Sequence, residues 1–75
     1  MIAVLGAGSW GSALALLLAR NGQTVRLWDH SAGHVASLRR DRENRRYLPG
    51  FELPASIEAV TDLGAAVDGA REVLV

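Results

Sequence analysis

The segment Gly6-Ala7-Gly8-Ser9-Trp10-Gly11 constrains the fold of this chain more than any other, because it matches G-x-G-x-x-G and lies between two apolar stretches. The stretch before it, Ile2-Ala3-Val4-Leu5, shows no polar alternation, which is typical of a strand buried on both faces of a parallel sheet. The stretch after it, residues 13–19, consists of the strong helix formers alanine and leucine. A glycine turn in this context predicts a dinucleotide-binding unit.

Each glycine of the turn has its own predicted function. Gly6 permits the tight turn, Gly8 lets the backbone come close to a pyrophosphate, and Gly11 lets the helix lie near the strand. The amides that open the helix then face the phosphates, helped by the helix dipole. Glycine turns also join strands to helices where no ligand binds, so the turn alone leaves a purely structural function open.

The same interpretation requires an acidic residue about 20 residues after the turn, at the end of the second strand. Asp29 occupies that place, after a strand predicted at 24–28 and a helix exit at Arg20-Asn21-Gly22, whose glycine suits a left-handed cap. A carboxylate here accepts hydrogen bonds from the adenosine ribose, which favours NAD and repels the extra phosphate of NADP. Because His30 can donate to that phosphate, particularly when protonated, NADP is disfavoured but not excluded. The alternative function of Asp29 is to cap a helix.

Two side chains of the turn can lie along the phosphates and sugars of a cofactor. The Ser9 hydroxyl can serve the helix amides or a bound phosphate, and these two functions are compatible. Trp10 either shields the cofactor or packs against a covering domain, and the sequence leaves both interpretations open.

Composition limits the chemistry that these residues supply. The eight basic and eight acidic residues cancel, so no net field favours nucleic acid or an anionic membrane. Cysteine is absent and all eight basic residues are arginine, which excludes thiolate and lysine chemistry within the 75 residues. The apolar stretch 13–19 is too short to span a bilayer and lacks a preceding basic segment, so we expect no membrane insertion and a cytoplasmic location.

Two charged features have a functional and an ordinary interpretation. His30 and His34 have the spacing of helical metal ligands, but Ser31 stands where a metalloprotease-type motif needs glutamate, so we expect no metal and two surface histidines. Residues 39–46 are rich in arginine, but acids are interleaved and no aromatic residue alternates with them, so we expect a solvated helix face rather than a nucleic-acid patch.

The remaining pattern predicts an α/β chain. A second helix is expected from about Ser31, its N-cap, to Glu43, with Val35 and Leu38 facing inward. The segment 47–54 is expected to lack regular structure, because it contains two prolines and a glycine, but to pack down through its four large apolar side chains. Three further elements are a strand at 57–60 with Glu58 suited to a sheet edge, a brief helix capped by Thr61 or Asp62 and ending at Gly69, and a strand at 72–75.

These elements predict half of a Rossmann-type doubly wound domain. Right-handed crossovers arrange the four strands as a parallel sheet in the order 3-2-1-4. A complete dinucleotide fold has two such halves, so we expect residues 1–75 to be part of a dinucleotide-binding domain within a longer protein. The first helix is apolar nearly all round, which predicts further protein covering it.

Three segments resemble the amino-terminal part of bacterial NAD(P)-dependent glycerol-3-phosphate dehydrogenase, and the resemblance extends over essentially the whole chain. They are residues 6–15, 25–28 and 44–50. The last of them, Asn44-Arg45-Arg46-Tyr47-Leu48-Pro49-Gly50, is the most discriminating, because a generic Rossmann turn does not require it. The resemblance implies that the rest of the dinucleotide domain and a helical substrate domain follow, and that the catalytic residues lie there, so none is named in this chain.

The resemblance also implies an activity. The family reduces dihydroxyacetone phosphate reversibly to sn-glycerol 3-phosphate with NAD or NADP, for glycerophospholipid synthesis, and a homodimer is possible. Ser9, Trp10 and His30 match cofactor-contacting positions of the family, Tyr47 is a further candidate, and the glycines match with the turn.

Two positions depart from the family pattern. Ser12 stands where threonine is common, which is a conservative change. Asp29-His30-Ser31 stands where glycine or alanine is usually followed by charged residues, and this change favours NAD. Two alternatives stay open: a dehydrogenase of another small hydroxy acid, and a nucleotide-sensing or binding module without catalysis.

Overall fold

Four parallel strands form the central sheet of the computed structural model, which describes residues 1–75. The strands are β1 (Ile2–Leu5), β2 (Val25–Trp28), β5 (Ile57–Val60) and β6 (Glu72–Leu74), and their spatial order is β5-β2-β1-β6. This is the predicted order 3-2-1-4 once two short strands outside the sheet are left out of the numbering. The register places Ile2 opposite both Val25 and Glu72.

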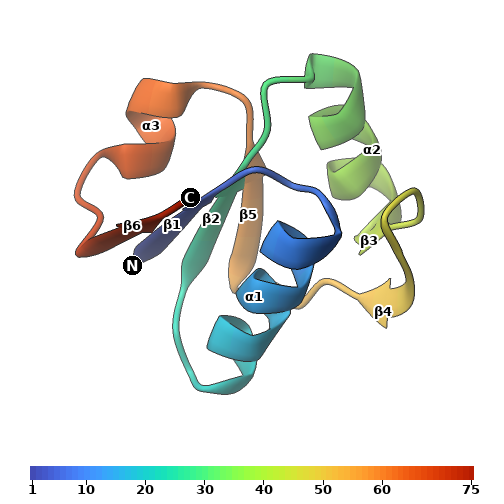
Figure 1. Ribbon diagram of the computed structural model, residues 1–75, viewed down its shortest axis with the longest axis horizontal. Helices are drawn as coiled ribbons and strands as arrows, with labels where there is room; N and C mark the ends of the chain where they lie inside the picture. The colour runs from blue at the N-terminus through green and yellow to red at the C-terminus, as the bar shows by residue number, and fades with distance from the viewer.

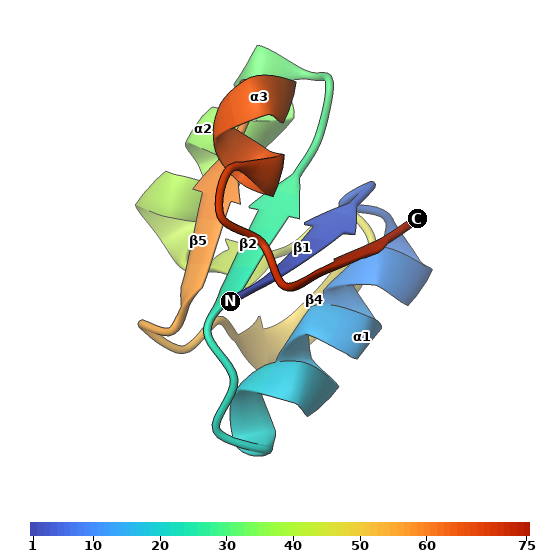
Figure 2. The same cartoon turned by 90° about the vertical axis from the view of Figure 1, so that its left-hand side faces the viewer.

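Helices cover both faces of this sheet. α1 (Ser9–Arg20) and α2 (Ala32–Asp41) lie on one face, and α3 (Leu63–Val67) lies on the other (Figures 1 and 2). Crossovers of one hand produce this arrangement, because the chain moves outward from β1 to β5 and then returns across the sheet to β6. The α/β doubly wound class predicted from the sequence is therefore confirmed.

Local signals in the sequence explain where the helices begin and end. The Ser31 hydroxyl accepts a hydrogen bond from the His34 amide and caps α2, and Asp62 caps α3 through the Ala65 amide, both as predicted. Gly22 follows the end of α1 with φ +83°, the left-handed conformation expected of it.

The core lies between the sheet and the α1 and α2 layer. It contains Val35 and Leu38 of α2, which face inward as predicted, together with Val25 and Leu27 of β2. The apolar strands fit this position, because both faces of the inner strands are covered.

The segment that follows α2 forms a small antiparallel ribbon, which the sequence interpretation missed. β3 (Glu43–Asn44) pairs with β4 (Leu48–Glu52) around an irregular register, and the predicted absence of regular structure at 47–54 is wrong. A two-stranded ribbon tolerates Pro49, because each strand has a free edge that needs no amide donor. The predicted packing was also too complete: Leu53 is buried and Leu48 half-buried, whereas the side chains of Tyr47 and Phe51 are exposed.

The second helix ends at Asp41, two residues before the predicted end. Arg42 adopts a left-handed conformation with φ +52°, and its guanidinium donates to three backbone carbonyl oxygens, those of Leu53, Pro54 and Ile57. Arg39 donates to a fourth, that of Ala59. The arginine-rich stretch is therefore only in part a solvated helix face. Two of its side chains, Arg39 and Arg42, connect α2 and its C-terminal end to β5 and to the residues just before β5.

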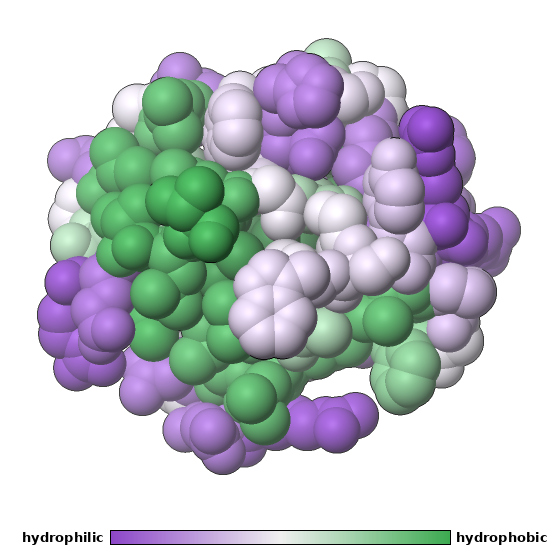
Figure 3. Space-filling view, in the orientation of Figure 1, coloured by the Kyte–Doolittle hydropathy of each residue, from purple (hydrophilic) through white to green (hydrophobic).

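Apolar surface gathers on the side of the molecule where α3, β6 and α1 lie (Figure 3). On α1 the Leu17 side chain is exposed, in agreement with the apolar first helix noted in the sequence. None of the helices is long and apolar enough to cross a membrane.

Candidate functional site

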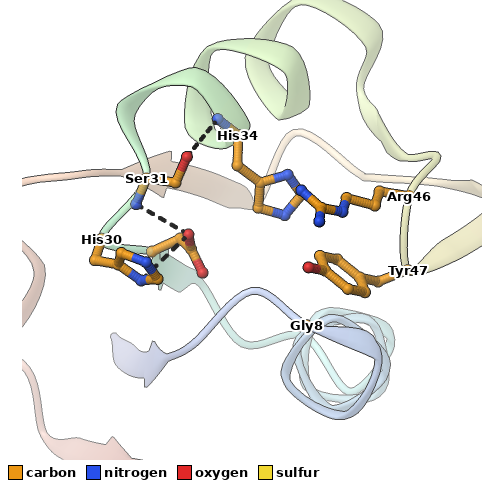
Figure 4. Close-up of a pocket in the computed structure, with 7 residues that line it drawn as sticks. Gly8, His30, Ser31, His34, Arg46 and Tyr47 are labelled. Atoms are coloured by element: carbon orange, nitrogen blue, oxygen red, sulfur yellow. Dashed lines mark hydrogen bonds and ion pairs between the residues drawn. The ribbon is translucent and has the colours of Figure 1, made fainter.

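A cleft of about 340 Å³ opens where the chain leaves the carboxyl ends of β1 and β2. This is where open parallel sheets bind their ligands. Figure 4 shows the side chains around it, with Arg46 and Tyr47 entering from one side and His30 from the other. The cleft is lined by Gly8, Asp29, His30, Ser31, His34, Arg46 and Tyr47.

The geometry of the glycine turn agrees with the three predicted functions. Gly6 has φ +116°, which side chains rarely tolerate. A Cβ atom at Gly11 would collide with the Gly6 carbonyl oxygen, so only glycine lets α1 start this close to the strand. At Gly8 a Cβ would meet nothing within 4 Å, so the backbone there faces open space within the cleft. A phosphate group can therefore approach the Gly8 backbone directly.

The N-terminus of α1 is the one helix start of the three that lacks a side-chain cap. Gly8 is its N-cap residue and supplies no hydrogen bond, whereas the caps of α2 and α3 are Ser31 and Asp62. The backbone amides of the first turn of α1 therefore remain free to donate hydrogen bonds to a phosphate, at the positive end of the helix dipole. These free amides and the open backbone at Gly8 fit the pyrophosphate of a dinucleotide.

Asp29 joins the glycine turn to the start of α2. One oxygen of its carboxylate accepts from the Ala7 amide at 3.1 Å and the other from the Ser31 amide at 3.0 Å. Neither helix uses it as an N-cap, because Ser31 itself has that function. Only 14% of the Asp29 side chain is exposed, but a carboxylate has about four acceptor positions, so capacity remains for a ribose hydroxyl.

Asn44 is the polar centre behind the cleft and is 1% exposed. Its amide nitrogen donates to the Ala7 carbonyl oxygen at 2.9 Å and lies 2.7 Å from the Ser12 hydroxyl. Its amide oxygen accepts from the Tyr47 backbone amide at 3.2 Å. One buried side chain thus connects the glycine turn, α1 and the loop that carries Tyr47.

Ser9 and His34 also hold the turn and that loop together. The Ser9 hydroxyl donates to the Tyr47 carbonyl oxygen at 2.8 Å, so in this structure it serves neither the helix amides nor the cleft. The His34 Nε2 atom lies 2.9 Å from the Ala7 carbonyl oxygen, and its ring meets the Tyr47 ring edge to face at 5.5 Å. The prediction that His34 is a surface histidine is wrong, since it is half-buried, whereas His30 is exposed.

Four of the predicted site residues meet at the cleft: Gly8, Asp29, His30 and Tyr47. Trp10 does not line it, and its side chain is 73% exposed. No group of histidine, cysteine, aspartate or glutamate residues in the structure is placed to hold a metal ion.

Sequence reasoning missed three residues of the site: His34, Asn44 and Arg46. Asn44 and Arg46 lie in the segment that resembles the dehydrogenase family. The asparagine in that segment could have been predicted to form buried hydrogen bonds. His34 carried no such signal, because its position facing Ala7 depends on how α2 packs beside the turn.

Comparisons with known proteins agree on the family. The profile described as NAD-dependent glycerol-3-phosphate dehydrogenase N-terminus matches residues 1–75. The chain is 59% identical over 68 residues to the glycerol-3-phosphate dehydrogenase (NAD(P)+) of Geobacillus thermodenitrificans, covering 91% of this chain and 20% of the relative. For the Stenotrophomonas maltophilia protein of the same name the identity is 57% over 74 residues, covering 99% of this chain and 22% of the relative.

Solved structures give the same result. The crystal structure of glycerol-3-phosphate dehydrogenase from Coxiella burnetii matches with a TM-score of 0.92 and 49% identity, over 96% of this chain and 22% of that one. The glycerol-3-phosphate dehydrogenase of Saccharomyces cerevisiae matches with a TM-score of 0.83 and 26% identity, over 96% of this chain and 24% of that one. The chain thus spans about a fifth of the length of the curated relatives it matches. The glycine turn, the cleft beside it and these matches together show that the chain belongs to the family of NAD-dependent glycerol-3-phosphate dehydrogenase N-termini.

Proposed function

We propose that this chain binds the adenosine and pyrophosphate of a nicotinamide dinucleotide and forms the cofactor-binding part of an oxidoreductase. The proposed reaction interconverts dihydroxyacetone phosphate and sn-glycerol 3-phosphate, and its product supplies glycerophospholipid synthesis. The observation that carries the proposal is the open backbone at Gly8 beside the uncapped start of α1, at the carboxyl ends of two parallel strands. Family membership supports the choice of substrate.

The proposed division of labour follows from what these residues offer. The bound cofactor supplies the hydride chemistry. The glycine turn and the first turn of α1 hold the pyrophosphate, with Gly6, Gly8 and Gly11 setting the shape of the turn. Asp29 and His30 hold the adenosine ribose. Residues beyond this family region, in the rest of the dinucleotide domain and a helical substrate domain, supply the catalytic groups.

Three more residues have narrower proposed functions. Tyr47 forms one wall of the cofactor cleft. Ser9 acts through its bond to the Tyr47 carbonyl oxygen, and turns to a phosphate only if that bond opens. Trp10 lies outside the cleft in this structure, so we place it along the more distant part of the cofactor or under a covering domain.

NAD is the preferred cofactor in this proposal, and NADP is accepted less well. The Asp29 carboxylate lies at the cleft, where its charge opposes a phosphate on the adenosine ribose. A cytoplasmic location and a homodimer complete the proposal. The exposed apolar surface of α1 supports an association that covers it, either by the rest of the protein or by a second subunit.

The test uses the complete gene product that carries this chain, with dihydroxyacetone phosphate and either NADH or NADPH. We expect oxidation of NADH to exceed that of NADPH. Turnover that favours NADPH would retain the enzyme and remove the proposed preference set by Asp29. Nucleotide binding without turnover would support the alternative of a nucleotide-sensing or binding module. Turnover with another small hydroxy acid in place of this substrate would support a dehydrogenase of that acid.

A further inference from the structure

Arg46 differs from most arginines of this chain because its guanidinium has no carboxylate or carbonyl partner. Six of the eight arginines donate to a backbone carbonyl or pair with an acid: Arg26, Arg39, Arg40, Arg42, Arg45 and Arg71. Arg20, the other exception, lies at the exposed end of α1. Arg46 is the one arginine that lines the cleft. Its five N–H donors are therefore available to a ligand there.

The Tyr47 ring supports Arg46 at the cleft. The guanidinium carbon lies 5.1 Å from the centre of that ring, within the range of a cation–π contact. The Tyr47 backbone is held on both sides, because its amide donates to Asn44 and its carbonyl accepts from Ser9. A guanidinium that stacks on an aromatic face keeps its N–H donors free at its edge. Arg46 therefore packs on a tyrosine whose backbone is hydrogen-bonded to Asn44 and Ser9.

The side chains around the cleft can donate hydrogen bonds to an anion. Arg46 carries the one permanent positive charge among the lining residues, His30 and His34 each have a ring N–H group, and Asp29 is the only carboxylate. Both oxygens of that carboxylate already accept from backbone amides, which offsets part of its negative charge. Figure 4 shows these basic side chains on the walls of the same cleft. A dinucleotide brings phosphate groups, for which the planar guanidinium is the best-matched side chain.

We propose that Arg46 binds a phosphate group of the dinucleotide held in this cleft. The inference rests on the proposed cofactor function and adds a residue that the glycine motif does not include. The phosphate can come from two places: the pyrophosphate, which NAD and NADP share, or the phosphate on the adenosine ribose, which only NADP carries. A loss common to both cofactors identifies the first, and a loss confined to NADP identifies the second.

The experiment measures the Kd of NADH and of NADPH by fluorescence titration of the complete gene product that carries this chain. Three variants are compared with the unchanged protein. Arg46→Gln removes the charge and the planar fork, and Arg46→Lys keeps only the charge. Arg45→Gln is the matched control, because Arg45 is the exposed neighbour, pairs with Glu43 and does not line the cleft.

We expect Arg46→Gln to raise the Kd of at least one cofactor about tenfold, as for the loss of a charge-assisted hydrogen bond. Arg46→Lys should recover part of that loss, and Arg45→Gln should change the Kd less than twofold. Thermal melting of each variant without cofactor should agree with that of the unchanged protein, since Arg46 has no structural partner but Tyr47. If the unchanged protein binds the cofactor and Arg46→Gln binds it equally well, the inference is wrong. If the unchanged protein binds neither cofactor, the proposed function itself fails.

Discussion

The side-chain amide of Asn44 donates to the carbonyl oxygen of Ala7 at 2.9 Å, across 37 residues of sequence. Ala7 is the first variable residue of the glycine turn, and its peptide group with Gly8 is planar. Fixing the carbonyl of that group also fixes the direction of the Gly8 amide, because the two point in opposite directions in a trans peptide. A residue of β3 thus sets the orientation of the phosphate-binding backbone.

Replacing Asn44 with leucine should therefore affect stability and cofactor binding together. The change removes the buried donor to Ala7 and leaves the part-buried Tyr47 amide without its acceptor. We expect the free energy of unfolding to fall by about 2 to 3 kcal/mol, as for buried polar groups left unpaired. Urea denaturation of the complete gene product measures this loss. Asn21→Leu is the control, because Asn21 is exposed and its side chain has no hydrogen bond, and an equal loss there would contradict the interpretation.

Replacing Gly11 with alanine should destabilise the fold. A Cβ at this position collides with the Gly6 carbonyl oxygen, and backbone cannot move aside as a flexible side chain can. We expect a loss of at least about 2 kcal/mol, as for overpacking in a close contact. Gly33→Ala is the matched control in α2, where the nearest atom is the Ser31 hydroxyl oxygen at 4.0 Å, and it should gain up to about 1 kcal/mol from helix propensity. Chemical denaturation that ranks the two variants the other way would refute this explanation.

Replacing Asp29 with asparagine should change the choice of cofactor. The variant keeps one side-chain oxygen for the Ala7 or Ser31 amide but loses the negative charge. We expect the Kd of NADPH divided by the Kd of NADH to fall on the order of tenfold, because a negative charge that repels the ribose phosphate is removed. Asp68→Asn, at the exposed end of α3, should leave the ratio unchanged. An unchanged ratio in Asp29→Asn would show that the charge does not select the cofactor.

The two helix caps allow stability to be separated from binding. Ser31→Ala and Asp62→Ala each remove one side-chain cap, and each should cost about 1 kcal/mol of unfolding free energy. Ser31 lines the cleft and Asp62 does not, so only Ser31→Ala should also weaken cofactor binding. Thermal melts and cofactor titrations on the same preparations check this. Equal effects of both variants on binding would mean that the cap acts on the site only through stability.

The Arg40 guanidinium donates to the Asp41 carboxylate and holds the pKa of that carboxyl below its ordinary value. A lowered pKa in the folded state stabilises the fold above the pKa of the unfolded chain, and this contribution disappears as the pH falls through the folded pKa. In an NMR titration, the Asp41 midpoint should rise towards its ordinary value in Arg40→Gln. A midpoint that does not move would assign the shift to another group.

The fold was predictable from the sequence to the extent that local signals decide it. The glycine turn, Asp29 at the end of β2 and the caps Ser31 and Asp62 are short-range patterns, and all appear where expected. The ribbon β3–β4 was not predictable in this way, because it depends on how Arg42 leaves the helix and contacts carbonyls far along the chain.

The candidate site also contains residues that short-range patterns predict and residues that they do not. Side chains on the turn and at the end of β2 follow from the motif. Asn44 and His34 reach Ala7 across 37 and 27 residues, and no periodicity or spacing encodes contacts of that range. Trp10 stays a prediction, because its side chain is exposed outside the cleft and meets neither of the partners that the sequence proposed for it.

The double anchoring of Ala7 has a thermodynamic consequence for ligand binding. Its amide donates to Asp29, and its carbonyl oxygen is held by Asn44 and by His34, so the peptide groups on both sides of this residue are hydrogen-bonded within the protein before any ligand arrives. A flexible glycine loop would lose conformational entropy on closing around a phosphate, and that loss would weaken the complex. Here the ordering has already taken place during folding. The affinity of the turn for a dinucleotide therefore depends in part on contacts within the protein, such as the bond from the buried Asn44 to Ala7.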